Sequence, residues 1–138
     1  MSGMTDLQEL LRSMSPQLQP EAYVFCCVEG DMADYLALSP IATFREREGL
    51  TLVVTQSAAE TIGVTIETTF RCITLTVHSS LEAVGLTAAV STVLAEHGIS
   101  ANVIAAYYHD HIFVPAGKAD QAVAILTALA NQSSGNQD

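Results

Sequence analysis

The chain has 138 residues, 49% of them hydrophobic, which supports one folded domain or two very small ones that share a core. Fifteen acidic and five basic residues give a formal net charge of −10, which repels phosphate backbones and anionic lipid surfaces, so we expect no nucleic acid and no membrane as a partner. No apolar run approaches the roughly 20 residues of a membrane span, and the N-terminus carries acids in place of a secretory signal, so we expect a cytoplasmic protein.

The three cysteines do not indicate a disulfide framework, because the number is odd and two of them are neighbours. Cys26 and Cys27 lie within YVFCCV, where the alternation of a strand sends them to opposite faces. We interpret the cysteines as small buried hydrophobic residues of a reducing compartment.

The first half of the chain alternates short helices with strands. Leu7, Leu10, Leu11 and Met14 have helical spacing, which predicts a short docking helix with Thr5 as a candidate N-cap. The elements expected after it are a strand over 21–28, a helical piece over 31–38, a hairpin over 42–55 with Gly49 at its turn, a helical turn over 57–63 capped by Ser57, and an extended segment over 64–70.

The second half repeats this order more clearly. Residues 71–78 alternate as a strand, and the apolar spacing from Leu86 to His97 predicts one helix that Gly98 closes. The remaining expected elements are a long apolar strand over 99–108, a returning strand over 112–115, a helix over 118–130 and a polar tail.

The order β-α-β-β-α therefore occurs twice, with shortened helices in the first copy. It predicts an α+β, ferredoxin-like fold of two tandem βαββα(β) units with antiparallel sheets, because each hairpin makes its strands antiparallel neighbours. A single α/β domain is the alternative. The expected division is an N-terminal helical segment (1–20), a degenerate first unit (21–69), a second unit (70–131) and a polar tail (132–138).

The chain lacks the common nucleotide-binding, zinc-protease and hydrolase motifs. Its densest polar cluster is YYHDHIF, in which His109 and His111 are two residues apart and flank Asp110. In the predicted fold the end of the strand before His78 and the start of the next helix lie at the same end of the sheet as this cluster. The cluster fits a polar turn, a rim that binds an organic ligand, or a metal or acid/base site.

Gly85 interrupts SSLEAVGLTAAV, just where a helix is expected to begin. The N–H groups of a helix N-terminus suit a carboxylate or phosphate, and a glycine there lets a ligand come close to the backbone. Close packing of this segment explains the glycine equally well.

Residues 78–115 (HSSLEAVGLTAAVSTVLAEHGISANVIAAYYHDHIFVP) resemble the ACT-type regulatory domain, and in particular small bacterial ACT-domain proteins of uncharacterised function. Residues 42–54 (ATFREREGLTLVV) are the counterpart in the first half, and the resemblance extends from about Leu7 to Leu129. It implies two ACT-like units in tandem, similar to the paired regulatory domains of aspartokinases and to the animal arginine sensor. The final strand of the second unit is not evident after the last helix, so it is either missing or supplied by another segment.

In those relatives an amino acid is held between units, with its carboxylate and amino groups at the loop and helix start that follow the first strand. The resemblance carries this role to the segment that contains Gly85, and it gives Asp110 contact with the ligand's side chain. Glu82 is placed by its offset from Gly85. The ligand-binding residues that we expect are Ser79, Ser80, Glu82, Val84, Gly85, Leu86, His109, Asp110 and His111.

We therefore expect a non-catalytic regulatory protein, not an enzyme, that binds an amino acid or a similar small metabolite between its units. No cofactor and no metal is expected, and the protein is expected to form a homodimer. One alternative is a ligand-free module for dimerisation or partner interaction. The less favoured alternative is a metal-dependent enzyme that uses His78, His109 and His111.

Overall fold

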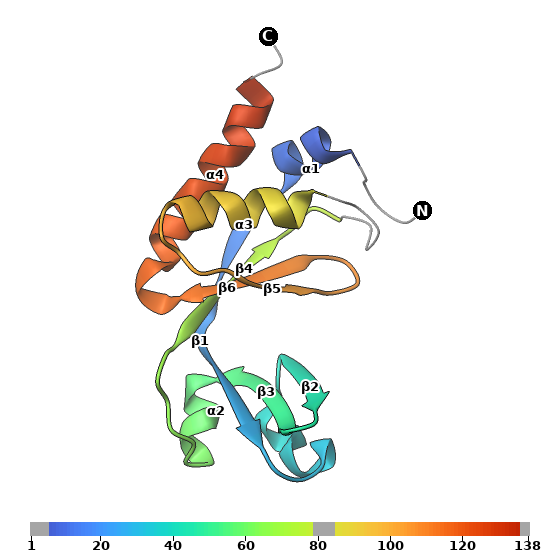
Figure 1. Ribbon diagram of the computed structural model, residues 1–138, viewed down its shortest axis with the longest axis vertical. Helices are drawn as coiled ribbons and strands as arrows, with labels where there is room; N and C mark the ends of the chain where they lie inside the picture. The colour runs from blue at the N-terminus through green and yellow to red at the C-terminus, as the bar shows by residue number, and fades with distance from the viewer. Residues whose placement is uncertain (1–5, 79–84, 136–138) are drawn as a thin grey trace. The chain divides into compact units, whose positions relative to one another are not determined.

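The computed structural model describes residues 6–78 and 85–135, which divide into two compact units (Figure 1). Unit 1 is built from residues 1–19 and 71–138, and unit 2 from residues 20–70. The chain therefore leaves unit 1 after Gln19 and returns to it at Arg71. The expected boundaries of the repeats, after residues 20, 69 and 131, stay a prediction. The two units are defined by their compactness, and this does not show where a repeat of the sequence begins or ends.

Unit 1 has a sheet in which the strands are hydrogen-bonded in the order β1-β4-β6-β5. Only the first residues of β1, up to Gln19, belong to this unit, and they fill the place of the final strand that the sequence did not reveal. The α+β, ferredoxin-like prediction is thereby confirmed. The elements of unit 1 are α1 (Leu7–Ser13), β1 (Pro16–Val28, in part), β4 (Phe70–Leu75), α3 (Leu86–Glu96), β5 (Asn102–Ala105), β6 (Asp110–Pro115), η2 (Ala116–Lys118) and α4 (Ala119–Gly135).

The core of unit 1 lies between its strands and the helices α1, α3 and α4, which cover one face of the sheet (Figure 1). Alternation along the strands places every second residue of β4 and β6 in this core, where the helices contribute apolar stripes. The largest buried side chains of this core are Leu10, Met14, Ile73, Leu75, Val90, Leu94, Ile99, Ile112 and Leu126.

Both ends of α3 are formed by glycines in a left-handed conformation. Gly85 is the N-cap with φ +103°. Gly98, with φ +72°, follows the helix, and its N–H donates to the carbonyl of Ala95 while the N–H of Ile99 donates to that of Leu94. This pair of bonds is the Schellman arrangement, so the prediction that Gly98 closes the helix is confirmed.

Unit 2 contains the rest of β1, η1 (Met32–Leu38), β2 (Ala42–Glu46), β3 (Gly49–Thr55) and α2 (Gln56–Thr61). Its strands follow the order β2-β3-β1, all antiparallel. Val24, Leu52 and Val54 lie on one sheet face and pack with Ala59 of α2 and with apolar residues of η1. The predicted hairpin over 42–55 is confirmed.

Several local predictions for the first half were wrong. The hairpin turn consists of the two residues between Glu46 and Gly49, which pair with each other, so Gly49 follows the turn. The N-cap of α2 is Thr55 in place of Ser57, because the Thr55 hydroxyl accepts from the N–H of Ala58 at 3.2 Å. The segment expected to be extended, 64–70, contributes only Phe70 to a strand.

Predictions outside these turns also need correction. Within the expected strand over 99–108 only Asn102–Ala105 is a strand, because the next residues form a turn. The helix α4 continues to Gly135 and so enters the segment expected to be a tail. Cys27 is exposed, since it lies on the face of unit 2 opposite to the core, while Cys72 is buried. In the described parts of the chain no helix is long and apolar enough to cross a membrane.

Candidate functional site

The candidate site lies at one end of the sheet of unit 1, where β4 ends and the β5–β6 hairpin turns. We call this region the rim and define it as residues 77–78 and 105–111. Ala105 pairs with Asp110, and the N–H of Ala106 donates to the carbonyl of His109 at 3.0 Å. Tyr107 and Tyr108 are therefore the two tip residues of the hairpin. The ring of His78 lies 5.1 Å from that of Tyr108, so the structure brings the end of β4 and the hairpin turn together.

The two histidines of the HDH cluster have different partners. Nδ1 of His109 lies 3.3 Å from the backbone carbonyl oxygen of Val77. Because a carbonyl only accepts, Nδ1 of His109 carries the hydrogen and donates it. The bond fastens the hairpin to the end of β4.

His111 ends a chain of hydrogen bonds that crosses three strands. The side-chain amide of Gln19 donates to the hydroxyl of Thr74 at 3.1 Å, and that hydroxyl lies 2.9 Å from Nδ1 of His111. Thr74 is 7% exposed, so this network is largely shielded from solvent, and its hydroxyl is the partner of both neighbouring side chains. Arg71 donates to the carbonyl of Gln19 through two nitrogens, at 2.7 and 3.2 Å. The side chain of His111 is thus held by the sheet itself.

Asp110, between these histidines, is half-buried. Burial raises the pKa of its carboxyl group above the ordinary 3.8, and the neighbouring His111 and His109 only partly oppose this. Burial also lowers the pKa of His111 below 6.5, helped by His109 and opposed by Asp110. The carboxylate at the rim is therefore incompletely compensated, which is a frequent property of ligand sites.

Gly85 begins α3 at the same end of the sheet (Figure 1). A Cβ atom added to it would lie 3.1 Å from Cδ2 of Leu7, so α1 occupies the side on which a side chain would project. Packing thus supplies one reason for the glycine. Leu86 is 3% exposed and belongs to the core, so only its backbone is available to a ligand.

The remaining expected ligand residues, Ser79, Ser80, Glu82 and Val84, lie outside the described residues. The metal-site alternative would need His78, His109 and His111 to converge. Over residues 6–78 and 85–135 no group of three His, Cys, Asp or Glu side chains is arranged to hold a metal ion.

Sequence reasoning missed two residues of the rim and two that support it from neighbouring strands. Tyr107 and Tyr108 were assigned to a strand, and their aromatic character favoured that assignment. Gln19 and Thr74 are 55 residues apart, so no local pattern could connect them. A signal for the tyrosines did exist, because they directly precede the polar HDH cluster that breaks the strand.

A separate groove of about 330 Å³ lies between α3 and α4, on the helical layer of unit 1. Its walls are mainly apolar, with His97 and two glutamines at the edges. It shares no residue with the rim.

Comparison with known proteins identifies the relatives of the chain. Two models of the ACT-domain family match it, one over residues 2–72 and the other over residues 67–128. A solved structure from Vibrio cholerae, of a protein of unknown function described as a possible transport protein, is 61% identical. It covers 90% of this chain and 95% of its own, with a TM-score of 0.83.

Two aspartokinase structures are more distant and show likeness of fold alone. Aspartokinase III of E. coli, in complex with aspartate and ADP, is 16% identical over 83% of this chain and 32% of its own, with a TM-score of 0.60. The ligand-free regulatory subunit of aspartate kinase from Thermus thermophilus is 12% identical over 83% of this chain and 95% of its own, also with a TM-score of 0.60. A search of curated proteins found no match.

Proposed function

The chain belongs to the ACT-domain family, and from this premise we propose that it is a non-catalytic regulatory protein that binds an amino acid or a similar small metabolite at the rim of unit 1. ACT domains and the likeness to aspartokinase regulatory subunits support a regulatory, ligand-binding role in general. The family resemblance implies an amino acid as the ligand class. We propose further that the protein is cytoplasmic and forms homodimers.

The observation that carries this proposal is Asp110, a half-buried carboxylate whose pKa burial raises, at the same end of the sheet as the start of α3. An α-amino acid carries both an ammonium and a carboxylate group. The ammonium would supply the positive charge that Asp110 lacks, since burying a carboxylate without a full partner costs free energy.

The carboxylate of the ligand would bind at the N-terminus of α3. The first N–H groups of a helix have no partner within the helix, and the helix dipole adds partial positive charge there. Gly85 provides no side-chain cap that would compete for these groups. Since Leu7 occupies one side of Gly85, the ligand would approach from the side of the loop before it, where the family resemblance places Ser79, Ser80 and Glu82.

A second candidate function, a module that binds a partner protein without a small ligand, is favoured by one observation. Phe44 on β2 and Leu36 in η1 are 70% and 63% exposed, which is unusual for large apolar side chains in a small unit.

The experiment is a screen of the twenty amino acids and common metabolites by thermal unfolding, followed by calorimetric titration of any hit. A ligand at about 100 times its Kd should stabilise the protein by roughly 2.7 kcal/mol. Asp110→Asn and Glu82→Gln should each weaken the binding, whereas Asp120→Asn, at an exposed carboxylate in the first turn of α4, should leave it unchanged. If no compound stabilises the protein, the ligand-binding proposal is wrong and the partner-binding module is favoured.

A further inference from the structure

The tip of the β5–β6 hairpin carries two tyrosines that the fold does not explain. Two-residue hairpin turns favour Gly, Asn and Asp, because the common turn types need positive φ. Neither Tyr107 nor Tyr108 has positive φ, and neither offers the side-chain hydrogen bonds of a typical turn residue. They also do not fill a core, since they are 71% and 60% exposed. Neither turn geometry nor burial accounts for two large rings at this position.

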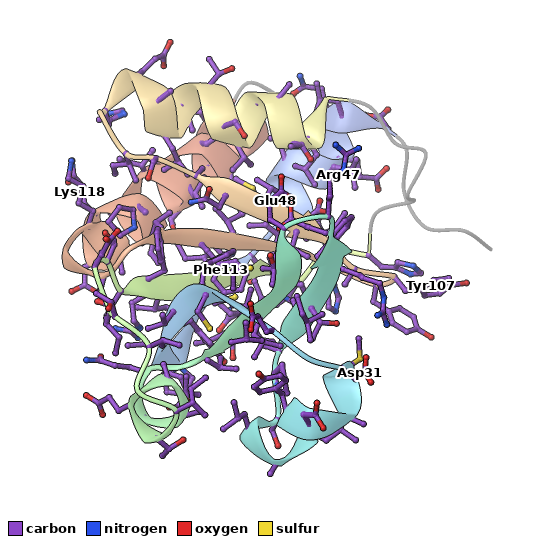
Figure 2. All side chains as sticks on the ribbon, turned by 60° about the horizontal axis from the view of Figure 1, so that its bottom comes forward. Asp31, Arg47, Glu48, Tyr107, Phe113 and Lys118 are labelled. Carbon is purple, nitrogen blue, oxygen red and sulfur yellow. The ribbon has the colours of Figure 1, made fainter. Side chains whose placement is uncertain are left out.

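These rings form an arrangement with His78 that we call the aromatic corner, defined as His78, Tyr107 and Tyr108. The centroids of the two tyrosine rings are 5.1 Å apart and the ring planes meet at 80°. The His78 ring lies 5.1 Å from Tyr108, tilted by 56°. Figure 2 shows Tyr107 pointing away from the strands at the end of the hairpin. The rings thus present π faces at steep angles to one another on an open surface.

The electrostatics of the region favour a positively charged occupant. The face of an aromatic ring is negative and attracts cations within about 6 Å of its centroid. Asp110 lies two residues after Tyr108, and the net charge of the chain is −10. Residues 77–78 and 105–111 contain none of the five Lys and Arg residues of the chain. No lysine or arginine side chain from these two segments therefore competes for the rings.

We propose that the aromatic corner binds a small organic cation through its alkylammonium or guanidinium group. The cation lies against the faces of Tyr107 and Tyr108, and the carboxylate of Asp110 contributes attraction over a longer range. The aromatic corner lies within the rim and shares Asp110 with the proposed amino-acid site, but it adds a chemical class of ligand that the proposed function does not name. It also accounts for the exposed tyrosines.

Choline and its uncharged counterpart of the same shape, 3,3-dimethylbutan-1-ol, test the role of the charge, and agmatine tests a guanidinium group. Binding is followed by calorimetry and by tyrosine fluorescence, which reports directly because the chain has no tryptophan. We expect choline or agmatine to bind and the neutral alcohol to bind at least fivefold more weakly.

The variants Tyr107→Leu and Tyr108→Leu keep an apolar side chain but remove the π face. Each should weaken cation binding by about 2- to 5-fold, and Tyr→Phe at the same positions should retain it. Phe44→Leu is the matched control, because it changes an equally exposed aromatic residue in unit 2 and should have no effect. Thermal unfolding of each variant shows that it is folded.

Equal affinity for choline and the neutral alcohol would overturn the proposal, as would leucine variants that bind the cations as well as the unchanged protein does. No binding of choline or agmatine would also overturn it. If an amino acid binds with the same affinity to the tyrosine variants, and these variants also bind the cations unchanged, the proposed function is supported and the aromatic-corner proposal is wrong. If cation binding depends on the tyrosines and no amino acid binds, the aromatic corner is supported and the proposed amino-acid binding is wrong.

Discussion

Replacing Gly85 by alanine tests why a glycine begins α3. Its φ of +103° lies where L-residues are strained, and holding a residue in such a region costs about 1–3 kcal/mol. The added Cβ would also lie 3.1 Å from Cδ2 of Leu7, so α1 has to shift by a few tenths of an ångström. We expect Gly85→Ala to lower the free energy of unfolding by about 2–3 kcal/mol, measured by urea denaturation.

Gly98 provides the matched control, because it ends the same helix with φ +72° and a Cβ there would meet nothing within 4 Å. Gly98→Ala should therefore lower the free energy of unfolding by only about 1–2 kcal/mol, the cost of holding an alanine in the left-handed conformation. Leu7→Ala combined with Gly85→Ala separates the two causes, since it removes the contact and leaves the backbone strain. The reasoning fails if Gly85→Ala destabilises no more than Gly98→Ala, or if the double variant shows no coupling between the two positions.

Changes at four further positions test the hydrogen bonds, the charges and the core of unit 1. Thr74→Val leaves the amide of Gln19 and Nδ1 of His111 without their partner, so it should cost about 1–3 kcal/mol in urea denaturation, whereas Thr74→Ser should cost less than half as much. The raised pKa of Asp110 means that stability is lost as pH rises through it, so Asp110→Asn should stabilise the ligand-free protein more at pH 7 than at pH 3, and an equal effect at both would contradict this. The pKa of His111 is lowered by folding, so the unfolded state takes up the proton first as pH drops. The free energy of unfolding should therefore fall below pH 6.5, and His111→Gln should reduce that fall. Leu126→Ala, at a fully buried core position, should cost about 2–5 kcal/mol, and a loss below 1 kcal/mol would show that α4 is not packed as described.

Local patterns predicted the elements whose signals lie within a few residues. The apolar spacing and the flanking glycines of α3 are of this kind, and so is the hairpin of β2 and β3. The first strand of unit 1 was missed for a different reason. Pro16–Gln19 has no clear alternation, and it becomes a strand through pairing with β4, more than fifty residues away. Such pairing depends on the fold of the whole unit, so the sequence of the segment alone does not predict it.

The candidate site was predictable in location and not in detail. The expected order of strands placed the HDH cluster beside His78, and the structure has these residues in one region. The chain from Gln19 through Thr74 to His111 could not be predicted, because it depends on the register between three strands. Tyr107 was assigned to a strand since aromatic residues favour strands, and its 71% exposure at the hairpin tip could not be predicted from the sequence.

The fold accounts for some of the predicted ligand residues and leaves others unexplained, and this difference indicates where function is concentrated. Gly85 is required by its φ and by the contact with Leu7, and Leu86 belongs to the core. A residue that the fold already requires is weak support for a ligand. Asp110 and the two tip tyrosines are different, because burial of the carboxylate and exposure of the rings both cost free energy without improving the packing. A protein tolerates such costs where a ligand offsets them, so the hairpin, and not the glycine, is the stronger indication of a binding site.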